Sequence, residues 1–383
     1  MHLLDVDVLA EDTCARLGYT LAPVGYTDST ACGLRNLGNT CYLNALLFSF
    51  SKIPALHAWC GRHQELHQNT QHCVLCGLAR DVTELTLSPE NTRFPPVTAS
   101  RRGIWNPAFA NTRPQDAQDA FVTLLDRCDD VDLSRLRAIL GDINDIELAR
   151  RRYSTPKWKI FGGLQQQTTT CAQCGACVID HQPFTDVQLE VDDVSALTLE
   201  TRVGNHFGHE GLDDSSCEQC PRYGKERVLG TRSKYTEVIR WPTVLVLHLK
   251  RWAWTPTGQR KIHRHIAFAT KLSLPDTSPY CLRSVVVHSG DAGGGHYTSY
   301  VRAQNDRWFF CNDSDTPVEV PTETVLEAQA YLLFYETTPR AGNVQASSTL
   351  RPTPPEVPAR SSAASSSACA ATSAPATSAL ADP

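Results

Sequence analysis

The sequence predicts an α+β protein, and three observations support this fold class. Apolar residues recur at helical spacing in the first third of the chain. After residue 240, short runs rich in β-branched and aromatic residues are typical of strands. Two Cys-x-x-Cys pairs lie between these two regions. Because the helical patterns come first and the strand patterns follow, we expect segregated helices and strands.

The composition indicates a globular protein in a reducing compartment. Of the 383 residues, 41% are hydrophobic, and the net charge of −5 gives no reason to expect a nucleic-acid or membrane partner. No apolar run approaches the roughly 18 residues of a membrane helix, and the N-terminus does not resemble a signal peptide. The 15 cysteines are an odd number, so we interpret them as metal ligands or catalytic residues in the cytoplasm or nucleus.

Two helices are expected before residue 130. After a lead-in over residues 1–30, the first helix begins at Cys41 and ends near Pro54. Its apolar face is formed by Leu43, Leu46, Leu47 and Phe50. The second helix covers residues 115–128 and has an apolar stripe made of Ala117, Ala120, Phe121, Leu124, Leu125 and Cys128.

Four strands are expected in the second half of the chain. Residues 243–252 form a buried strand, residues 297–303 and 307–313 form neighbouring strands, and residues 331–336 close the set. Residues 339–383 consist mainly of Ser, Ala, Pro and Thr. This tail is predicted to be disordered, because it has too little apolar surface to offset its chain entropy.

The two Cys-x-x-Cys pairs predict one structural zinc site. Two residues between thiolates allow a tight turn to direct both sulfurs at one ion, and two such turns give a closed tetrahedral site. The alternative is four unrelated buried thiols. Cys177 is interpreted as a spare thiol. The pair Cys73 and Cys76 is interpreted as buried residues at a helix start, since no second pair matches them, and metal binding is the alternative. The predicted ligands are Cys171, Cys174, Cys217 and Cys220.

Cys41 has three possible roles: a structural thiol, a metal ligand or a nucleophile. It lies where "LGNT" leads into the first helix, and helix N-terminal amides lower a thiol pKa. Asn39 or Thr40 is a candidate cap for this helix, and Gly38 suits a sharp turn before it. The position therefore suits a nucleophile, provided that a base lies nearby.

His296 is the candidate base. Most of the 13 histidines are interpreted as surface residues, but His296 follows three glycines and leads into a strand. Asn312 and Asp313 end the next strand, and an antiparallel hairpin returns that end to the vicinity of His296. Together with Cys41, these residues predict a triad for acyl transfer.

Several motifs resemble those of the ubiquitin-specific proteases, a papain-like family of deubiquitinating enzymes. "GLRNLGNTCYLNALLFSF" is similar to the Cys box of that family, and "GGGHYTSYVR", "RWFFCNDSDTPVEV" and "YLLFYE" are similar to its His box. "RPQDAQDAFVTLLD", "TVLVLHLKRW" and the two Cys-x-x-Cys turns also match. The resemblance extends from about Gly33 to Glu336, with the motifs in the family's order.

The resemblance implies a papain-like fold with a helical thumb, a palm sheet and zinc-bearing fingers. The catalytic domain is expected over residues 31–338, with the fingers at about 160–250. Cys41 is the implied nucleophile, His296 the base and Asn312 the third triad residue. The resemblance further implies that Asp313 assists the triad, that Asn36 holds the oxyanion together with the Cys41 amide, and that the ubiquitin tail contacts Gly294, Gly295 and Asp119. Two positions depart from the family pattern: Cys311 replaces an aromatic residue, and Asp119 replaces a glutamate.

The implied reaction is hydrolysis of the bond after the C-terminal glycine of ubiquitin. Ubiquitin and ubiquitinated proteins are the expected partners, and the protein is expected to be a monomer. Two alternatives remain: a protease for another modifier with a Gly-Gly tail, or a catalytically silent scaffold that binds ubiquitin. The scaffold is disfavoured because all three triad residues are present.

Overall fold

The computed structural model divides into two compact units. The first contains residues 1–165, 183–207 and 238–338, and the second contains residues 166–182, 208–237 and 339–383. The predicted disordered tail and most of the predicted lead-in lie outside the described residues. No helix in the described part is long and apolar enough to cross a membrane. The structure describes residues 12–19, 32–67, 72–89, 91–141, 143–192, 197–212, 216–217, 220, 232–256, 258–291 and 294–337.

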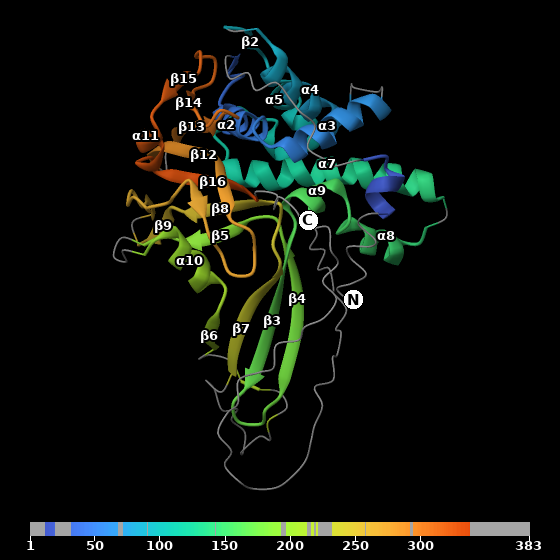
Figure 1. The fold of residues 1–383 in the computed structure, drawn as a ribbon, viewed down its shortest axis with the longest axis vertical. Helices are drawn as coiled ribbons and strands as arrows, with labels where there is room; N and C mark the ends of the chain where they lie inside the picture. The colour runs from blue at the N-terminus through green and yellow to red at the C-terminus, as the bar shows by residue number, and fades with distance from the viewer. Residues whose placement is uncertain are drawn as a thin grey trace. The chain divides into compact units, whose positions relative to one another are not determined.

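The helices belong to the first unit, and most of them precede the main sheet in the sequence (Figure 1). This order confirms the predicted α+β class. The helices are α2 (Cys41–Phe50), α3 (Pro54–Leu66), α4 (Val74–Leu87), α5 (Val97–Ser100), α6 (Arg102–Trp105), α7 (Ala117–Leu140), α8 (Asp145–Arg152), α9 (Pro156–Phe161), α10 (Leu199–His206) and α11 (Thr322–Leu326), with a 3₁₀ turn η1 (Pro107–Phe109).

Helix α2 is enclosed on all sides, which the sequence did not predict. All ten of its residues are buried, whereas the apolar spacing indicated one buried face. Two of its polar side chains are hydrogen-bonded: Ser49 Oγ donates to the Ala45 carbonyl at 3.0 Å, and Asn44 Nδ2 donates to groups outside the helix. Pro54 begins α3 instead of only ending α2, because proline suits the first turn of a helix.

Helix α7 begins as predicted but runs twelve residues beyond the predicted end at 128, to Leu140. The predicted apolar stripe is buried throughout. The continuation was missed because its buried face mixes the carboxylates of Asp129 and Asp132 with Leu133 and Leu136, which interrupts the apolar pattern. The Asp132 carboxylate accepts hydrogen bonds from the Tyr19 hydroxyl at 2.7 Å and the Trp59 indole N–H at 2.8 Å. These bonds allow a charged residue to be buried where a sequence pattern would place it at the surface.

The first unit is built around an eight-stranded sheet. Its order is β15-β14-β13-β12-β16-β8-β5, with β11 also paired to β12. The ladders are antiparallel except for the parallel pair β5 and β8. The four predicted strands are confirmed as β8, β13, β14 and β16. The strands are β5 (Val187–Glu190), β8 (Val244–Lys250), β11 (Lys271–Leu272), β12 (Tyr280–Asp291), β13 (Gly294–Arg302), β14 (Trp308–Cys311), β15 (Val318–Val320) and β16 (Ala330–Thr337).

Strand β8 shows how this sheet separates two hydrophobic cores. Val244 and Val246 belong to the core shared with α2, α3, α4 and α7. Leu245, Leu247 and Leu249 belong to a second core that includes residues of α10 and α11. Because successive side chains of a strand point to opposite faces, a continuous apolar run fits a strand that is covered on both faces.

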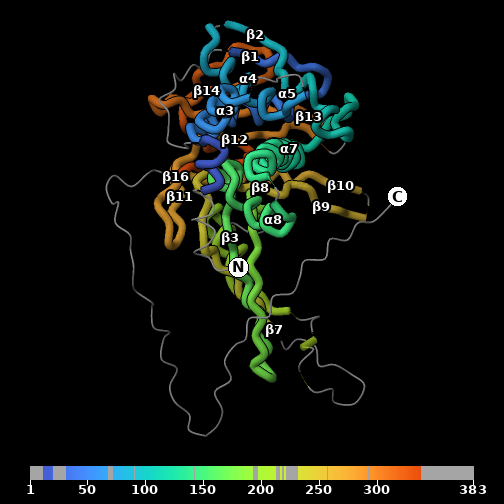
Figure 2. The backbone as a smooth tube through the Cα atoms, turned by 90° about the vertical axis from the view of Figure 1, so that its right-hand side faces the viewer, coloured from blue at the N-terminus to red at the C-terminus, as the bar shows by residue number. Residues whose placement is uncertain are grey.

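Two short sheets complete the first unit. Strands β1 (Gly33–Leu34) and β2 (Arg93–Phe94) pair in parallel. Strands β9 (Trp252–Thr255) and β10 (Gly258–Lys261) form an antiparallel hairpin, and Figure 2 shows the two strands beside each other.

The second unit contains most of a four-stranded sheet of order β4-β3-β7-β6. Strands β3 and β7 lie side by side in both views (Figures 1 and 2). Most of β3 is only half-buried and most of β4 is exposed, so this sheet has few apolar residues of its own to bury. The strands are β3 (Gly163–Cys171), β4 (Cys177–Phe184), β6 (His209–Leu212) and β7 (Arg232–Arg240).

Candidate active site and metal centre

A sharp turn before α2 makes Cys41 the first residue of the helix. Gly38 (φ +93°) and Asn39 (φ +52°) both adopt left-handed backbone conformations, which fits the role predicted for Gly38. The Asn36 side chain holds this turn: its Oδ1 accepts from the Gly38 amide at 3.0 Å and from the Thr40 amide at 3.1 Å.

The expectation that Asn39 or Thr40 caps α2 is wrong. Thr40 occupies the N-cap position, but its side chain makes no capping hydrogen bond to the helix. Its Oγ1 instead accepts from the Leu37 amide at 2.8 Å, and the Asn39 side chain donates to the Thr112 carbonyl. The amide groups in the first turn of α2 therefore donate no hydrogen bond to either side chain.

The Cys41 thiol is nearly enclosed, with 6% of the residue exposed. Burial raises its pKa, and Asp313 adds to this rise; the backbone amides of Tyr297, Tyr42 and Cys41 act in the opposite direction. The expectation of a lowered pKa from the helix N-terminus is therefore wrong for the thiol alone, because desolvation of the thiolate outweighs the amides. A thiolate at this position needs a neighbouring group that takes the proton.

His296 and Asn312 are brought together as the sequence predicted. Strands β13 and β14 form an antiparallel hairpin, and His296 Nε2 lies 2.6 Å from Asn312 Oδ1. Asn312 Nδ2 lies 2.6 Å from a carboxylate oxygen of Asp315, which accepts only. This fixes Oδ1 as the acceptor for His296, so Nε2 carries the imidazole proton. The Nδ1 atom of a neutral His296 is then unprotonated and available as a base.

Asp313 connects the end of this hairpin to the Cys41 turn. Its Oδ2 accepts from Asn36 Nδ2 at 2.8 Å, and its Oδ1 accepts from Asn44 Nδ2 at 2.7 Å. Its backbone carbonyl also accepts from the Leu34 amide at 2.7 Å. The residue thus binds groups on both sides of Cys41 in the sequence, and it leaves Asn36 with one amide hydrogen for another acceptor.

A pocket of about 450 Å³ opens beside Cys41. Gly294 and Gly295 line it, whereas Asp119 is exposed in the first turn of α7 and does not. A Cβ atom on Gly295 would lie 2.2 Å from His288 Nε2 and 2.4 Å from the Ser289 carbonyl oxygen. The pocket is lined by Asn39, Cys41, Tyr42, Arg113, Pro114, Gln115, Asp116, Trp252, Gln259, His288, Asp291, Gly294, Gly295 and Tyr297.

Most of the pocket residues were not singled out in the sequence, among them Asp116, His288 and Trp252. Asp116 caps α7 by accepting from the Gln118 amide at 2.7 Å, a role that its place before an apolar helical run could have indicated. His288 is buried, and its pKa is lowered to about 4 by burial and by Lys261, whose Nζ lies 3.0 Å from its Nδ1. His288 is therefore neutral at pH 7. No sequence pattern pointed to His288 or to Trp252.

The four predicted zinc ligands form one cluster. The sulfur atoms of Cys171, Cys174, Cys217 and Cys220 all lie within 4.8 Å of one another. The Cys171–Cys220 and Cys174–Cys217 sulfur pairs are both 3.6 Å apart, close to the roughly 3.8 Å edge of a zinc–thiolate tetrahedron. The donor set therefore fits a metal ion, and Cys177 lies outside the cluster.

Comparison with known proteins identifies the family. The sequence model described as "Ubiquitin carboxyl-terminal hydrolase" matches residues 32–335. The chain belongs to the ubiquitin carboxyl-terminal hydrolase family. This chain is 30% identical over 324 residues to ubiquitin carboxyl-terminal hydrolase 25 of Arabidopsis thaliana, with 79% of this chain and 47% of the relative covered. It is 28% identical over 370 residues to ubiquitin carboxyl-terminal hydrolase 3 of Homo sapiens. This match covers 81% of this chain and 68% of the relative.

A solved structure supports the fold assignment. The chain resembles one in the SAGA DUB module Ubp8/Sgf11/Sus1/Sgf73 bound to monoubiquitin, with a TM-score of 0.68 and 23% sequence identity. The match covers 88% of this chain and 76% of the solved chain. The predicted family and the predicted fold are thus confirmed. The chain spans 47% and 35% of the lengths of two Arabidopsis relatives, so it corresponds to part of those proteins.

Proposed function

We propose that this hydrolase is a cysteine-type deubiquitinase that cleaves the bond after the C-terminal glycine of ubiquitin. The observation that carries the proposal is the oriented His296–Asn312 pair. In this pair the Nδ1 nitrogen of His296 is unprotonated. The next residue, Tyr297, contacts the Cys41 thiol through its backbone amide. A nucleophile, an oriented base and a pocket bordered by glycines are the parts that acyl transfer to a glycine carbonyl requires.

The proposed first stage is acyl transfer to Cys41. His296 Nδ1 removes the thiol proton, and the sulfur attacks the carbonyl carbon of the terminal glycine. The tetrahedral intermediate then collapses: the C–N bond breaks, His296 returns the proton to the departing lysine amine, and a thioester remains. In the second stage water gives its proton to His296 and attacks the thioester, which releases the carboxylate and regenerates the thiol.

Asn36 is the proposed oxyanion donor, together with the Cys41 backbone amide. One Nδ2 hydrogen of Asn36 is held by Asp313, and Oδ1 is held by two turn amides. The second Nδ2 hydrogen is thereby given a fixed direction before the substrate arrives. One such donor raises kcat by a factor of about 10²–10³ when it is preorganised.

Gly294 and Gly295 are the proposed border of the channel for the ubiquitin tail. Both line the pocket that contains Cys41. The contacts that a Cβ atom would make at Gly295 show that this position has no space for a side chain. Asp119 is proposed as a tail contact at the rim, since it lies three residues after the pocket residue Asp116. A tail without side chains, such as Gly-Gly, suits this channel.

A ubiquitin substrate with a fluorogenic C-terminal group tests the proposal. Wild type should release the fluorophore, and Cys41→Ala should not, because the acyl acceptor is absent. Cys281→Ser is the matched control: it removes a half-buried thiol from β12, away from the pocket, and should keep wild-type turnover. Equal turnover by wild type and Cys41→Ala would refute the proposal.

A competition experiment tests the modifier. Ubiquitin and ubiquitin-like activity probes are mixed with the enzyme, and labelling of Cys41 should favour ubiquitin. Support for ubiquitin as partner comes from the Ubp8 module, whose solved structure contains monoubiquitin. Preferential labelling by another Gly-Gly-tailed modifier would change the substrate but keep the chemistry.

We also propose that zinc occupies the four-cysteine cluster. Four thiolates at tetrahedral spacing suit Zn²⁺ and leave no open position, so the role is structural. None of the described cysteines forms a disulfide bond, which fits a reducing compartment such as the cytoplasm or nucleus.

A further inference from the structure

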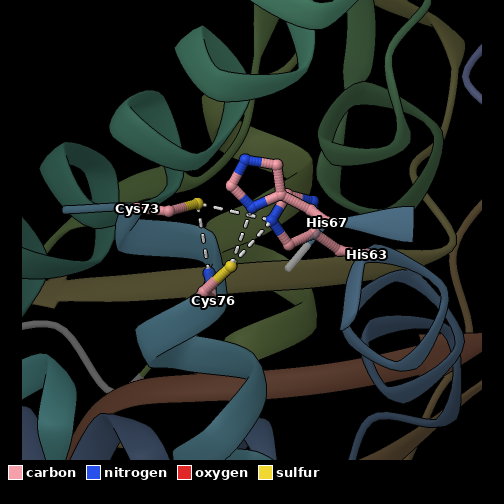
Figure 3. A group of neighbouring side chains, drawn as sticks. All are labelled: His63, His67, Cys73 and Cys76. Atoms are coloured by element: carbon pink, nitrogen blue, oxygen red, sulfur yellow. Dashed lines mark hydrogen bonds between the residues drawn. The ribbon is translucent and has the colours of Figure 1, made fainter. Parts of the chain in front are cut away.

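A second cluster of metal-ligating side chains lies in the first unit, apart from the four-cysteine cluster. Its members are His63, His67, Cys73 and Cys76, and one ligand atom from each lies within 4.8 Å of the others. Figure 3 shows both sulfur atoms pointing toward the two imidazole rings. No second cysteine pair matches Cys73 and Cys76, because their partners in this cluster are histidines.

Two helix ends bring these residues together. His63 lies in the last turn of α3 and His67 is its C-cap, so the i, i+4 spacing directs both rings to one side. Cys73 is the N-cap of α4 and Cys76 lies in its first turn. The two helices pack against each other. The local pattern is therefore His-x₃-His facing Cys-x₂-Cys, a spacing typical of Cys₂His₂ zinc sites.

The distances within the cluster fit a tetrahedral ion. His63 Nε2 lies 3.3 Å from both Cys73 Sγ and Cys76 Sγ, and His67 Nδ1 lies 3.2 Å from Cys76 Sγ. With zinc bonds of about 2.3 Å to sulfur and 2.0 Å to nitrogen, tetrahedral angles separate the two ligand types by about 3.5 Å. The Cys76 amide points at Cys73 Sγ at 3.4 Å, an arrangement that stabilises a thiolate.

A chain of hydrogen bonds orients His63 through its Nδ1 atom. Its Nδ1 lies 3.3 Å from the Tyr19 hydroxyl, which donates to Asp132 at 2.7 Å. Asp132 also accepts from the Trp59 indole at 2.8 Å. An imidazole that binds metal through Nε2 carries its proton on Nδ1, and the Tyr19 oxygen is placed to accept that proton. Outer partners of this kind fix the tautomer and the ring orientation of metal-binding histidines.

We propose that His63, His67, Cys73 and Cys76 bind a second zinc ion, whose role is structural. Two thiolates and two imidazoles suit Zn²⁺, and four protein ligands leave no open coordination position. His63 is fully buried, and Cys76 is 3% exposed. The ion joins the end of α3 to the start of α4. Since α4 packs against α2, which carries Cys41, and against α7, the site stabilises the helices behind the candidate active site.

Metal content of the purified full-length chain is the first test. We expect two zinc ions per wild-type chain, one in each cluster. His63→Ala and Cys76→Ser should each reduce this number by one, and Cys171→Ser should remove the other ion. His72→Ala is the matched control, because this exposed neighbour of Cys73 is not in the cluster, and it should keep both ions. Unchanged zinc content in both His63→Ala and Cys76→Ser would overturn the proposal.

Cobalt spectroscopy is the second test, and it does not depend on the stability of a ligand-deleted variant. His67→Cys keeps four ligands but changes the set from two thiolates to three. After replacement of zinc by Co²⁺, this variant should bind the same number of ions as wild type, with a stronger thiolate charge-transfer band. A spectrum identical to wild type would show that residue 67 does not bind the ion, and it would overturn the four-ligand assignment.

Discussion

Asp313 shows at the residue scale how one carboxylate organises the candidate site. It accepts hydrogen bonds from Asn36 and Asn44, which lie before and after Cys41 in the sequence. The resemblance to ubiquitin-specific proteases implied only that Asp313 assists the triad. Its contacts support a more specific hypothesis: Asp313 positions the oxyanion donor, whereas Asn312 positions the base.

Replacing Asn36 by alanine should lower kcat about 10²–10³-fold, because one oxyanion donor is lost. KM should change little if this contact forms only in the transition state. Asn36 also holds the turn before α2, so the melting temperature should fall as well. Steady-state kinetics with fluorogenic ubiquitin and a thermal melt measure both effects. Asp313→Asn keeps the shape of the side chain and should lose less activity than Asn36→Ala; the reverse order would contradict the positioning role.

Asp81 determines part of the pH dependence of stability. Its carboxylate is buried and accepts from the Val97 and Thr98 amides, both at 2.7 Å. Burial raises its pKa from 3.8 to about 6, although these bonds and Arg80 lower it. The folded pKa exceeds the unfolded one, so the protonated carboxyl stabilises the fold below about pH 4. This contribution is lost as the pH rises through about 6.

The expected consequence is that the unfolding free energies of wild type and Asp81→Asn change differently with pH. Between pH 5.5 and 7.5, wild type should lose about 1 kcal/mol of unfolding free energy relative to the variant. The variant should also be less stable overall, since an amide presents a donor to one of the two backbone N–H groups. Urea unfolding at several pH values measures both quantities, and parallel pH profiles would contradict the assignment.

At the element scale, the β12–β13 hairpin depends on its glycines. Gly290 and Gly294 have φ of +107° and +152°, and a Cβ on Gly295 would clash with the backbone at Ser289. Lys261 Nζ also binds the end of this hairpin by donating to the His288 and Gly290 carbonyls at 2.6 and 3.0 Å. The sequence showed the glycine run, but the reason for it is the close approach of two strands beside the pocket.

Gly295→Ala should therefore lower both stability and kcat/KM, because the added methyl group must displace backbone or the His288 ring. Gly204→Ala is the matched control: this glycine lies in α10, and a methyl group added there would meet open space. That change should stabilise the protein by roughly 0.5–1 kcal/mol, since alanine is the better helix former. Thermal melts and turnover assays compare the two, and equal effects would contradict the steric argument.

At the scale of the whole molecule, the two units differ in what stabilises them. The first unit has two large hydrophobic cores. The second unit has half-buried and exposed strands, with Cys171 and Cys217 among its few buried apolar residues. We therefore propose that the zinc expected at the four-cysteine cluster supplies much of the stability of this unit, which has little apolar surface to bury.

Loss of the four-cysteine site should consequently affect the second unit most. Cys171→Ser or Cys220→Ser should remove about one zinc ion per chain and speed hydrogen exchange in β3, β4, β6 and β7. Cys177→Ser should keep the ion, because this thiol lies outside the cluster. Metal analysis and hydrogen-exchange mass spectrometry measure these outcomes. A metal-free variant with wild-type exchange in these strands would show that the cluster does not stabilise them.

The sequence by itself determined the family, the order of helices and strands, and the pairing of His296 with Asn312. It could do so because these signals are local: helical spacing, strand composition, motif order, and a hairpin that returns one strand beside another. The four-cysteine cluster was predictable for the same reason, since each half is a short turn.

Only the tertiary structure decided how these pieces act together. Burial raises the Cys41 pKa against the effect of the helix N-terminus. Asp313 joins groups more than 260 residues away in sequence, and His63 and His67 meet Cys73 and Cys76 between two packed helices. These properties depend on which surfaces exclude water and which distant segments touch. Local spacing does not encode that information, because packing of the whole chain sets it.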